Sequence, residues 1–226
     1  MPDEYIKEVS DAVHAQGGMF VLDCIASGAV WVDMDKLGVD VLISAPQKGW
    51  SDSPGFGMVM LSERALIDLT NTKSTSFACD LNKWLQIMQA YEGGGHAYHA
   101  TMPTDTIHSF RNTIYETSKF GFDKAKEKQQ ELGIKIRSLL ESNGINSVSA
   151  KGFQAPGVVV SYTKDTGIHN GSKFMDIGVQ IAAGVPLKCD EGESFKTFRL
   201  GLFGLDKLMD VDGAVSRFSA ALKLVT

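Results

Sequence analysis

Residues 20–50 read FVLDCIASGAVWVDMDKLGVDVLISAPQKGW, and this stretch decides the fold. Two short apolar runs, residues 19–22 and 39–43, are rich in Val, Leu and Ile and too short for helices, so they predict buried strands. Asp23 directly follows the first run, and Lys48 comes shortly after the second. Parallel strands of an open α/β sheet end at the same edge, where such folds bind ligands. We therefore expect Asp23 and Lys48 to lie together at that edge.

A carboxylate and a primary amine presented together suit pyridoxal phosphate. The amine forms a Schiff base with the aldehyde of the cofactor, and the carboxylate holds the pyridine nitrogen protonated so that the ring accepts electrons. Each residue also has a simpler interpretation. An Asp at the end of a strand often stabilises a turn or a helix start, and a Lys after a strand is usually a solvated surface residue.

The spacing around the two residues favours the cofactor site. Asp23 and Ser27 form an Asp-x-x-x-Ser element, and Ser44, Gln47 and Lys48 form a Ser-x-x-Gln-Lys element. The whole string closely resembles the class V family of pyridoxal-phosphate-dependent aminotransferases, of the alanine–glyoxylate and serine–glyoxylate type. The resemblance implies an α/β protein of fold type I, with a mostly parallel sheet in the large domain and a small C-terminal α/β domain.

The resemblance also implies a role for each residue near the cofactor. Lys48 carries the Schiff base and then shuttles a proton, and Asp23 binds the pyridine nitrogen. Gln47 donates to the phosphate, and Ile25 packs on one face of the ring. The implied reaction moves an amino group from an alanine- or serine-like amino acid to a 2-oxo acid such as glyoxylate or pyruvate.

A second motif follows three consecutive glycines. Residues 97–103 read AYHATMP, which resembles the Tyr-x-x-Thr-x-Pro element of the same family. In that family the two hydroxyls reach the cofactor phosphate of the neighbouring subunit, so the resemblance assigns this role to Tyr98 and Thr101 and implies a homodimer. Hydroxyls suit phosphate because they add hydrogen bonds without adding charge. From local sequence alone, the segment is equally a loop before a helix that starts after Pro103.

A third motif lies near the C-terminus. Residues 198–204 read FRLGLFG and resemble the Arg-(Ile/Leu)-Gly-x-x-Gly strand of the family, in which the Arg binds the substrate carboxylate. A planar guanidinium offers two parallel donors to a carboxylate, which Lys cannot match. The resemblance therefore assigns substrate binding to Arg199. An Arg at a strand edge, paired with a surface acid, is the ordinary alternative.

Periodicity and breaker residues predict an alternation of helices and strands. We expect two domains, with residues 1–120 as the C-terminal part of the cofactor-binding large domain and residues 121–226 as the small domain. The predicted strands cover residues 19–22, 39–43, 56–61, 158–162 and 197–202. The predicted helices cover residues 2–16, a segment that starts at 62, and residues 80–92, 104–142, 171–182 and 211–224, with a short polar turn at 33–38.

The resemblance covers essentially all 226 residues, but these match only the later part of the family's chain. Members of the family carry well over a hundred residues before the Asp motif, including a phosphate-binding loop at a helix N-terminus. We therefore expect a fragment, a misplaced start codon or one piece of a split protein. An inactive fragment and an α/β domain without a cofactor are alternatives. A cysteine desulfurase-like lyase is another because Cys189 precedes Arg199, although such enzymes place His where this chain has Gln47.

Composition excludes several other classes of protein. The chain has 43% apolar and 22% charged residues, which is ordinary for a soluble globular protein, and its net charge of -5 is unlike that of a nucleic-acid-binding protein. No apolar run approaches the roughly 20 residues that cross a membrane. Cys24, Cys79 and Cys189 are too far apart for a zinc site or a disulfide framework, so we expect no metal and a reducing, cytoplasmic setting.

Overall fold

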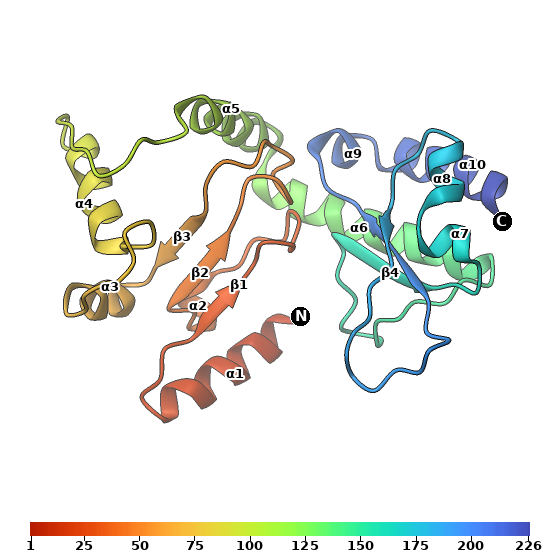
Figure 1. Ribbon diagram of the computed structural model, residues 1–226, viewed down its shortest axis with the longest axis horizontal. Coiled ribbons are helices and arrows are strands. Elements are labelled where there is room, and N and C mark those ends of the chain that lie inside the picture. Colours follow the sequence, from red (N-terminus) through yellow and green to blue (C-terminus); the bar gives the residue numbers. More distant parts are fainter.

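The first sheet contains the two strands predicted within the deciding stretch, with a third strand beside them (Figure 1). The computed structural model describes all residues from 1 to 226. The strands of this sheet, in the spatial order β1-β2-β3, are β1 (Val21–Asp23), β2 (Val41–Ser44) and β3 (Met58–Leu61). β1 and β2 are parallel, with Asp23 opposite Ile43, whereas β3 is antiparallel to β2.

The first sheet is less parallel than expected, because only one of its two strand pairings is parallel. Parallel neighbours need a long crossover, usually through a helix. Residues 45–57, which connect β2 to β3, contain no helix, and the Ser-Pro-Gly turn at residues 53–55 lies within them. The chain therefore reverses here and returns beside β2 in the opposite direction.

Four helices accompany this sheet: α1 (Asp3–Ala15), α2 (Met34–Leu37), α3 (Glu63–Thr70) and α4 (Leu81–Glu92). α2 occupies the segment predicted as a polar turn. The last three helices each begin after a side-chain oxygen that accepts a backbone N–H of the first turn, from Asp33, Ser62 and Asp80. The buried core of this half is small and consists of Ile6, Leu22, Leu37, Val39 and Leu42.

The long helix predicted over residues 104–142 is two helices, α5 (Thr104–Phe120) and α6 (Phe122–Ser142). The break falls at Gly121, whose φ of 102° is outside the helical region. α6 turns one apolar face inward, with Ala125, Leu132, Ile136 and Leu140 at helical spacing and all but inaccessible to solvent. In Figure 1, α6 runs from the first half of the molecule into the second.

The second sheet is fully antiparallel and has the order β4-β6-β5. Its strands are β4 (Val158–Tyr162), β5 (Ala182–Ala183) and β6 (Thr197–Gly201), and its helices are α7 (Thr166–His169), α8 (Ser172–Asp176), α9 (Leu205–Met209) and α10 (Val211–Val225). The helix predicted over residues 171–182 is wrong beyond α8. Gly178 has a φ of 76°, which ends helical backbone, and the chain then enters β5.

The larger core lies around the second sheet. Fifteen buried apolar residues form one cluster there, which includes Phe174 and Phe198, both at 0% exposure, and reaches Ala29 in the loop after β1. The two halves are therefore joined by apolar contact as well as by α6. None of the helices combines the length and the apolar character that crossing a membrane requires.

Candidate active site

Asp23 and Lys48 are placed at the same edge of the first sheet, as predicted. Asp23 is the last residue of β1 and lies opposite Ile43 of the parallel strand β2. The N–H of Cys24 continues this pairing by donating to the carbonyl oxygen of Ile43 at 2.8 Å. β2 ends one residue later at Ser44, and Lys48 lies in the loop that follows. Both side chains therefore leave the sheet at its carboxyl edge.

The loops that carry these two residues touch each other. A Cβ placed on Gly49 would approach the carbonyl oxygen of Gly28 more closely than 3.0 Å, a separation that real Cβ atoms essentially never show. Gly28 itself has a φ of 72°, which favours glycine. Glycine at position 49 thus lets the loop after β2 lie directly against the loop after β1.

The side chains of Asp23 and Lys48 are both exposed and available. One carboxylate oxygen of Asp23 accepts the N–H of Ile25 at 2.9 Å, which orients the carboxylate across its own turn. The amine of Lys48 has no hydrogen-bond or ion-pair partner in the chain, and neither residue forms an ion pair with the other. Gln47 is also exposed beside Lys48, whereas the hydroxyl of Ser27 donates to the carbonyl oxygen of Cys24 at 2.9 Å.

A hollow of about 670 Å³ opens beside Asp23. Ile25 is half-buried in its wall, and the remaining lining comes from the N-terminus and α1, β1 and the loop after it, Gln130 of α6 and residues 152–156. This volume is in the range of ligand pockets, about 300–1,000 Å³. Lys48 lies outside the lining. The carboxylate matches the acceptor that a protonated pyridine nitrogen requires, the unpaired amine suits the aldehyde, and the half-buried Ile25 offers an apolar wall, so these residues fit pyridoxal phosphate.

Cys24 is next to Asp23 but is unsuited to act as a nucleophile. Burial and, to a smaller extent, the negative charge of Asp23 raise the pKa of its thiol to about 11, against a small opposing effect of the N-terminal amine. A thiol with this pKa is almost entirely protonated near neutral pH, and the thiolate is the reactive form. Cys24 is therefore a neutral, half-buried side chain beside Asp23.

Tyr98 and Thr101 lie close to each other but apart from the other predicted site residues. The Tyr98 hydroxyl is 3.2 Å from the Thr101 hydroxyl, and the Tyr98 residue is 78% exposed. The loop that carries them passes along the outside of the molecule between α4 and α5 (Figure 1). No hydrogen bond or ion pair joins this pair to Asp23 or Lys48, so the chain presents the two hydroxyls outward.

Arg199 is half-buried in the central strand β6 of the second sheet. Its Nε donates to the carbonyl oxygen of Ala183 at 2.9 Å, and its two terminal amino groups have no partner in the chain. The glycine end of the same motif reaches the Lys48 loop, since a Cβ placed on Gly204 would lie 3.3 Å from the Ser51 hydroxyl oxygen. The motif at residues 198–204 therefore comes near the Lys48 loop at Gly204, and the Arg199 guanidinium is five residues earlier in the chain.

Cys189, the basis of the lyase alternative, lies exposed in the loop before β6. The carboxylate of Glu191 accepts the N–H groups of Lys188 and Cys189, each at 2.8 Å. These and the neighbouring backbone hydrogen bonds lower the pKa of Glu191 to about 2. The Glu191 carboxylate thus holds this loop together, and no hydrogen bond or ion pair activates the Cys189 sulfur.

Gln129 is a residue that the sequence analysis missed. It is fully buried on α6, and it joins the loop after β1 to the residues just before β4 and just after β6. Its Oε1 accepts the N–H of Ala29 at 3.3 Å, and its Nε2 donates to the carbonyl oxygens of Pro156 at 3.1 Å and Leu202 at 3.2 Å. A polar residue inside the apolar stripe of a predicted helix was the available signal, because buried amides need partners.

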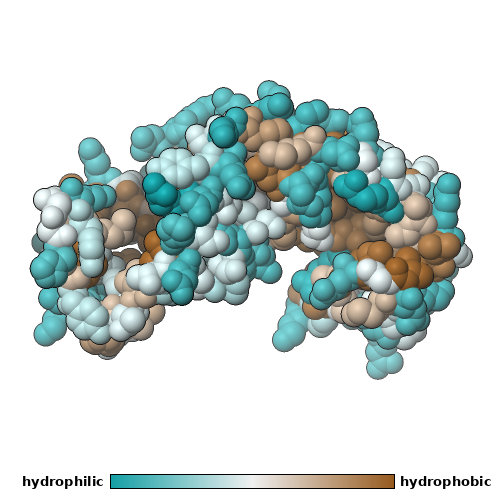
Figure 2. All heavy atoms as spheres, turned by 90° about the horizontal axis from the view of Figure 1, so that it is seen from above, coloured by the Kyte–Doolittle hydropathy of each residue, from teal (hydrophilic) through white to brown (hydrophobic).

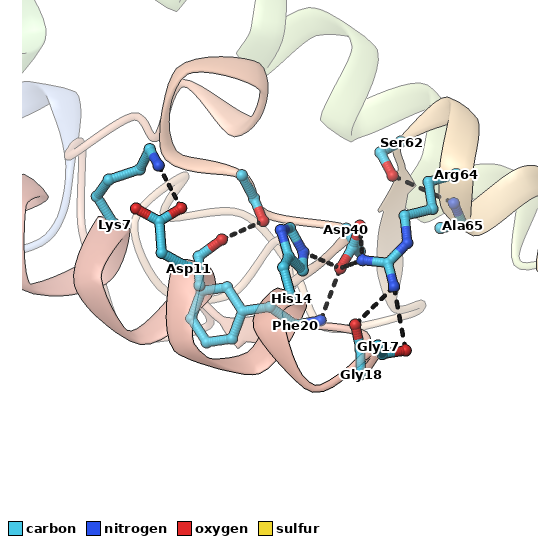
Figure 3. Close-up of polar contacts among 12 residues, drawn as sticks. Lys7, Asp11, His14, Gly17, Gly18, Phe20, Asp40, Ser62, Arg64 and Ala65 are labelled. Atoms are coloured by element: carbon cyan, nitrogen blue, oxygen red, sulfur yellow. Dashed lines mark hydrogen bonds and ion pairs between the residues drawn. The ribbon is translucent and has the colours of Figure 1, made fainter.

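A polar cluster occupies the opposite edge of the first sheet, where β2 begins (Figure 3). The Asp40 carboxylate, 4% exposed, accepts the N–H of Phe20 at 2.7 Å and lies 2.8 Å from His14 Nε2 and 3.2 Å from the Arg64 guanidinium. Arg64 also donates to the carbonyl oxygen of Gly18 at 2.7 Å. Burial alone would raise the pKa of Asp40, but these partners outweigh it and hold the pKa below the ordinary value.

The comparisons with known proteins agree with this geometry. The family described as aminotransferase class-V matches residues 4–190. The alanine–glyoxylate aminotransferase 1 of Saccharomyces cerevisiae is 29% identical over 170 residues, which are 71% of this chain and 44% of that protein. The 2-aminoethylphosphonate–pyruvate transaminase of Syntrophobacter fumaroxidans is 26% identical over 207 residues, which are 88% of this chain and 53% of that protein.

The structural comparison shows the same fold. The crystal structure of an alanine–glyoxylate aminotransferase from Nostoc sp. superposes with a TM-score of 0.76 and 21% identity, over 95% of this chain and 56% of that one. The fold is therefore the α/β fold type I of pyridoxal-phosphate-dependent aminotransferases, over the part that this chain covers. The chain spans about half the length of the relatives it matches. With a family match over most of its length and the Asp and Lys motifs at one sheet edge, this chain belongs to the aminotransferase class-V family.

Proposed function

We propose that this chain supplies the catalytic lysine and the ring-binding carboxylate of a pyridoxal-phosphate-dependent aminotransferase. The reaction would move an amino group from an alanine- or serine-like amino acid to a 2-oxo acid such as glyoxylate or pyruvate. One observation carries the proposal: an unpaired amine and an exposed carboxylate, Lys48 and Asp23, stand on touching loops at the carboxyl edge of two parallel strands. The names of the relatives support the choice of reaction.

The two central residues would have complementary tasks. The Lys48 amine would hold the cofactor at its aldehyde carbon, with loss of one water molecule, and when free would take up a proton from the substrate α-carbon. The Asp23 carboxylate holds a proton at the pyridine nitrogen, and the N–H of Ile25 keeps that carboxylate oriented. Pyridoxal phosphate, when bound, supplies an electron sink for the negative charge that develops at the α-carbon.

The surrounding residues would bind and orient. Ile25 offers an apolar wall to one face of the ring, and Gln47 offers amide donors to the phosphate. Arg199 uses only its Nε within the chain, so its two terminal amino groups remain available for the substrate carboxylate. For Arg199 to reach the substrate, residues 121–226 would act as the small domain. They would cover the carboxyl edge of the first sheet, which belongs to residues 1–120.

The same proposal includes a homodimer. Tyr98 and Thr101 are turned outward beside each other and would bind the phosphate in the site of a second copy. α4, next to their loop, buries none of its residues, and Met88 and Tyr91 on it are each 61% exposed. Figure 2 shows apolar surface among polar atoms at the end of the molecule where α3 and α4 lie. A second copy would cover this surface and receive the two hydroxyls.

Covalent trapping tests the role of Lys48. The chain is incubated with pyridoxal phosphate, reduced with borohydride, digested and mapped by mass spectrometry. We expect the label on Lys48, with much less on Lys36, an exposed lysine of the same half that serves as the internal control. A label spread evenly over surface lysines, with Lys48 unmodified, would overturn the proposed function.

A further inference from the structure

The loop that carries Lys48 is folded back on itself. The N–H of Asp52 donates to the carbonyl oxygen of Pro46 at 3.1 Å, and the N–H of Ser51 donates to that of Lys48 at 2.9 Å. Pro46 is buried, whereas Lys48 is exposed between the two ends of the closed turn. The direction in which the Lys48 side chain leaves the protein therefore depends on the orientation of the whole turn.

The turn is attached to α5 through the side chain of Asp52. One carboxylate oxygen accepts the Ser109 hydroxyl at 2.8 Å, and the other accepts the Thr113 hydroxyl at 2.8 Å. The first oxygen also accepts the N–H of Ser53 at 2.7 Å. Partial burial by itself would raise the pKa of Asp52, but these three hydrogen bonds outweigh it and lower the pKa. The carboxylate is thus fully engaged and charged near neutral pH.

Aromatic contacts place the same turn against the same helix. The Trp50 ring lies 5.2 Å from the Phe110 ring, edge to face, and 4.8 Å from the Trp31 ring. Such contacts hold the turn against α5 but fix the orientation of the turn weakly, because apolar burial has no direction. Two hydrogen bonds from residues one helical turn apart do fix rotation, since each has its own required geometry. Asp52 therefore supplies the directional part of this attachment.

We propose that Asp52 is a positioning residue that aims the Lys48 amine by locking its turn onto Ser109 and Thr113 of α5. Asp52 forms no ion pair with Lys48, so it acts through the backbone of the turn. The role depends on the proposed function, in which Lys48 binds the cofactor. α5 also continues from the loop of Tyr98 and Thr101, so the same attachment sets the Lys48 turn relative to the outward-facing hydroxyls.

Variants on both sides of the contact separate this role from a general loss of stability. Asp52→Ala removes the acceptor, and the double substitution Ser109→Ala with Thr113→Val removes the two donors. Asp52→Asn is the conservative variant, since an amide can accept from one hydroxyl and donate to the other. Ser118→Ala, an exposed hydroxyl of α5 without a hydrogen bond, is the matched control.

Two measurements are made on each variant of the full chain. The first is amide hydrogen exchange of the peptide that covers residues 46–53, without cofactor. The second is the ratio of label on Lys48 to label on Lys36 after treatment with pyridoxal phosphate and borohydride. A general loss of stability lowers this ratio but also speeds hydrogen exchange throughout the chain, whereas a misaimed turn lowers the ratio with faster exchange confined to residues 46–53.

We expect Asp52→Ala and the double variant each to lower the Lys48 to Lys36 ratio by about fivefold or more, the factor for roughly one net hydrogen bond. Both should also speed exchange in residues 46–53. A variant that combines Asp52→Ala with the double substitution should lower the ratio no further than Asp52→Ala alone, because all three substitutions remove the same contact. Asp52→Asn and Ser118→Ala should stay within about twofold of the unsubstituted chain, since neither removes the anchor.

An unchanged ratio in Asp52→Ala, or effects that multiply in the combined variant, would overturn the positioning role. Failure of the proposed function has a different signature. In that case Lys48 is unlabelled already in the unsubstituted chain, while accelerated exchange in Asp52→Ala would still support the anchor and unchanged exchange would overturn it.

Discussion

Gly49 and Gly28 lie in direct contact, with no room for a side chain on Gly49 before it meets the carbonyl oxygen of Gly28. The contact joins the loop that carries Lys48 to the loop that carries Asp23. The two glycines each lie one residue beyond a predicted motif, and their contact depends on the absence of a single carbon atom at position 49.

Gly49→Ala should lower the free energy of unfolding by about 1–3 kcal/mol, because the added methyl group must push the two loops apart. Urea unfolding followed by circular dichroism gives this value. Gly57→Ala is the matched control, since a Cβ there meets nothing within 4 Å, and it should change stability by less than about 1 kcal/mol. Equal effects of the two substitutions would show that the loops have room to separate.

Asp23→Asn should leave the fold intact and reduce transaminase turnover by about 100-fold or more, because the neutral amide no longer holds a proton at the pyridine nitrogen. The side chain is exposed and has one hydrogen bond within the chain, from the N–H of Ile25. That bond survives the substitution. The measurement is the rate of amino transfer from alanine to glyoxylate. Unchanged turnover in this variant would rule out the role of Asp23.

Gln129→Leu should destabilise the chain by at least about 2 kcal/mol, because it leaves three buried or part-buried backbone groups without partners. These are the N–H of Ala29 and the carbonyl oxygens of Pro156 and Leu202. Gln130→Leu makes the same chemical change one residue later at an exposed position and should have little effect. Comparable unfolding midpoints for the two variants would mean that water or repacking replaces the lost hydrogen bonds.

Asp40 should give the chain a specific loss of stability in acid. Its pKa is lower in the folded chain than the ordinary value of 3.8, so the unfolded chain takes up the proton first as the pH falls. The stabilisation is therefore complete above the ordinary value and is lost as the pH falls through the folded value. Asp40→Asn should flatten the decline of the unfolding free energy below about pH 4. Asp35→Asn, a carboxylate without hydrogen bonds, should leave the decline unchanged.

The chain should form a homodimer through the surface that α4 presents. Light scattering at micromolar concentration should give the mass of two chains, and Met88→Glu should shift the mass toward one chain by placing a charge in the contact. Ile134→Glu is the matched control, because Ile134 is 62% exposed against 61% for Met88 and lies on α6. A single-chain mass that nevertheless binds the cofactor tightly would contradict the shared site.

The elements that could be predicted from sequence are those with local causes. The strand at residues 158–162 was predicted with the bounds that it has, because a short apolar run is bounded by turn residues. The helix after Asp80 was predicted for its cap and for the glycines that end it. The helix over 171–182 failed because Gly178, exposed and with a φ of 76°, ends it locally, with the N–H of Val179 donating to the carbonyl oxygen of Phe174, and apolar periodicity does not report such an end.

The candidate site was predictable in its chemistry but only partly in its assembly. The order of strands placed Asp23 and Lys48 at one edge, and the parallel pairing of β1 and β2 confirms that placement. The contacts that hold the edge together join residues far apart in sequence, such as Asp52 with Thr113, and no local pattern specifies them. Whether Tyr98 and Arg199 take part stays a prediction.

The unequal cores of the two halves have a consequence for the order in which the chain folds. Fifteen buried apolar residues surround the second sheet, whereas five support the first. Cooperative folding units with more buried apolar contact open at higher free energy, so the second sheet with α6 and α10 should form the persistent nucleus of the chain. The half that bears Lys48 then condenses onto a surface that already exists. The sheet edge with Asp23 and Lys48 would be the last part of the chain to become ordered as it folds and the first to open.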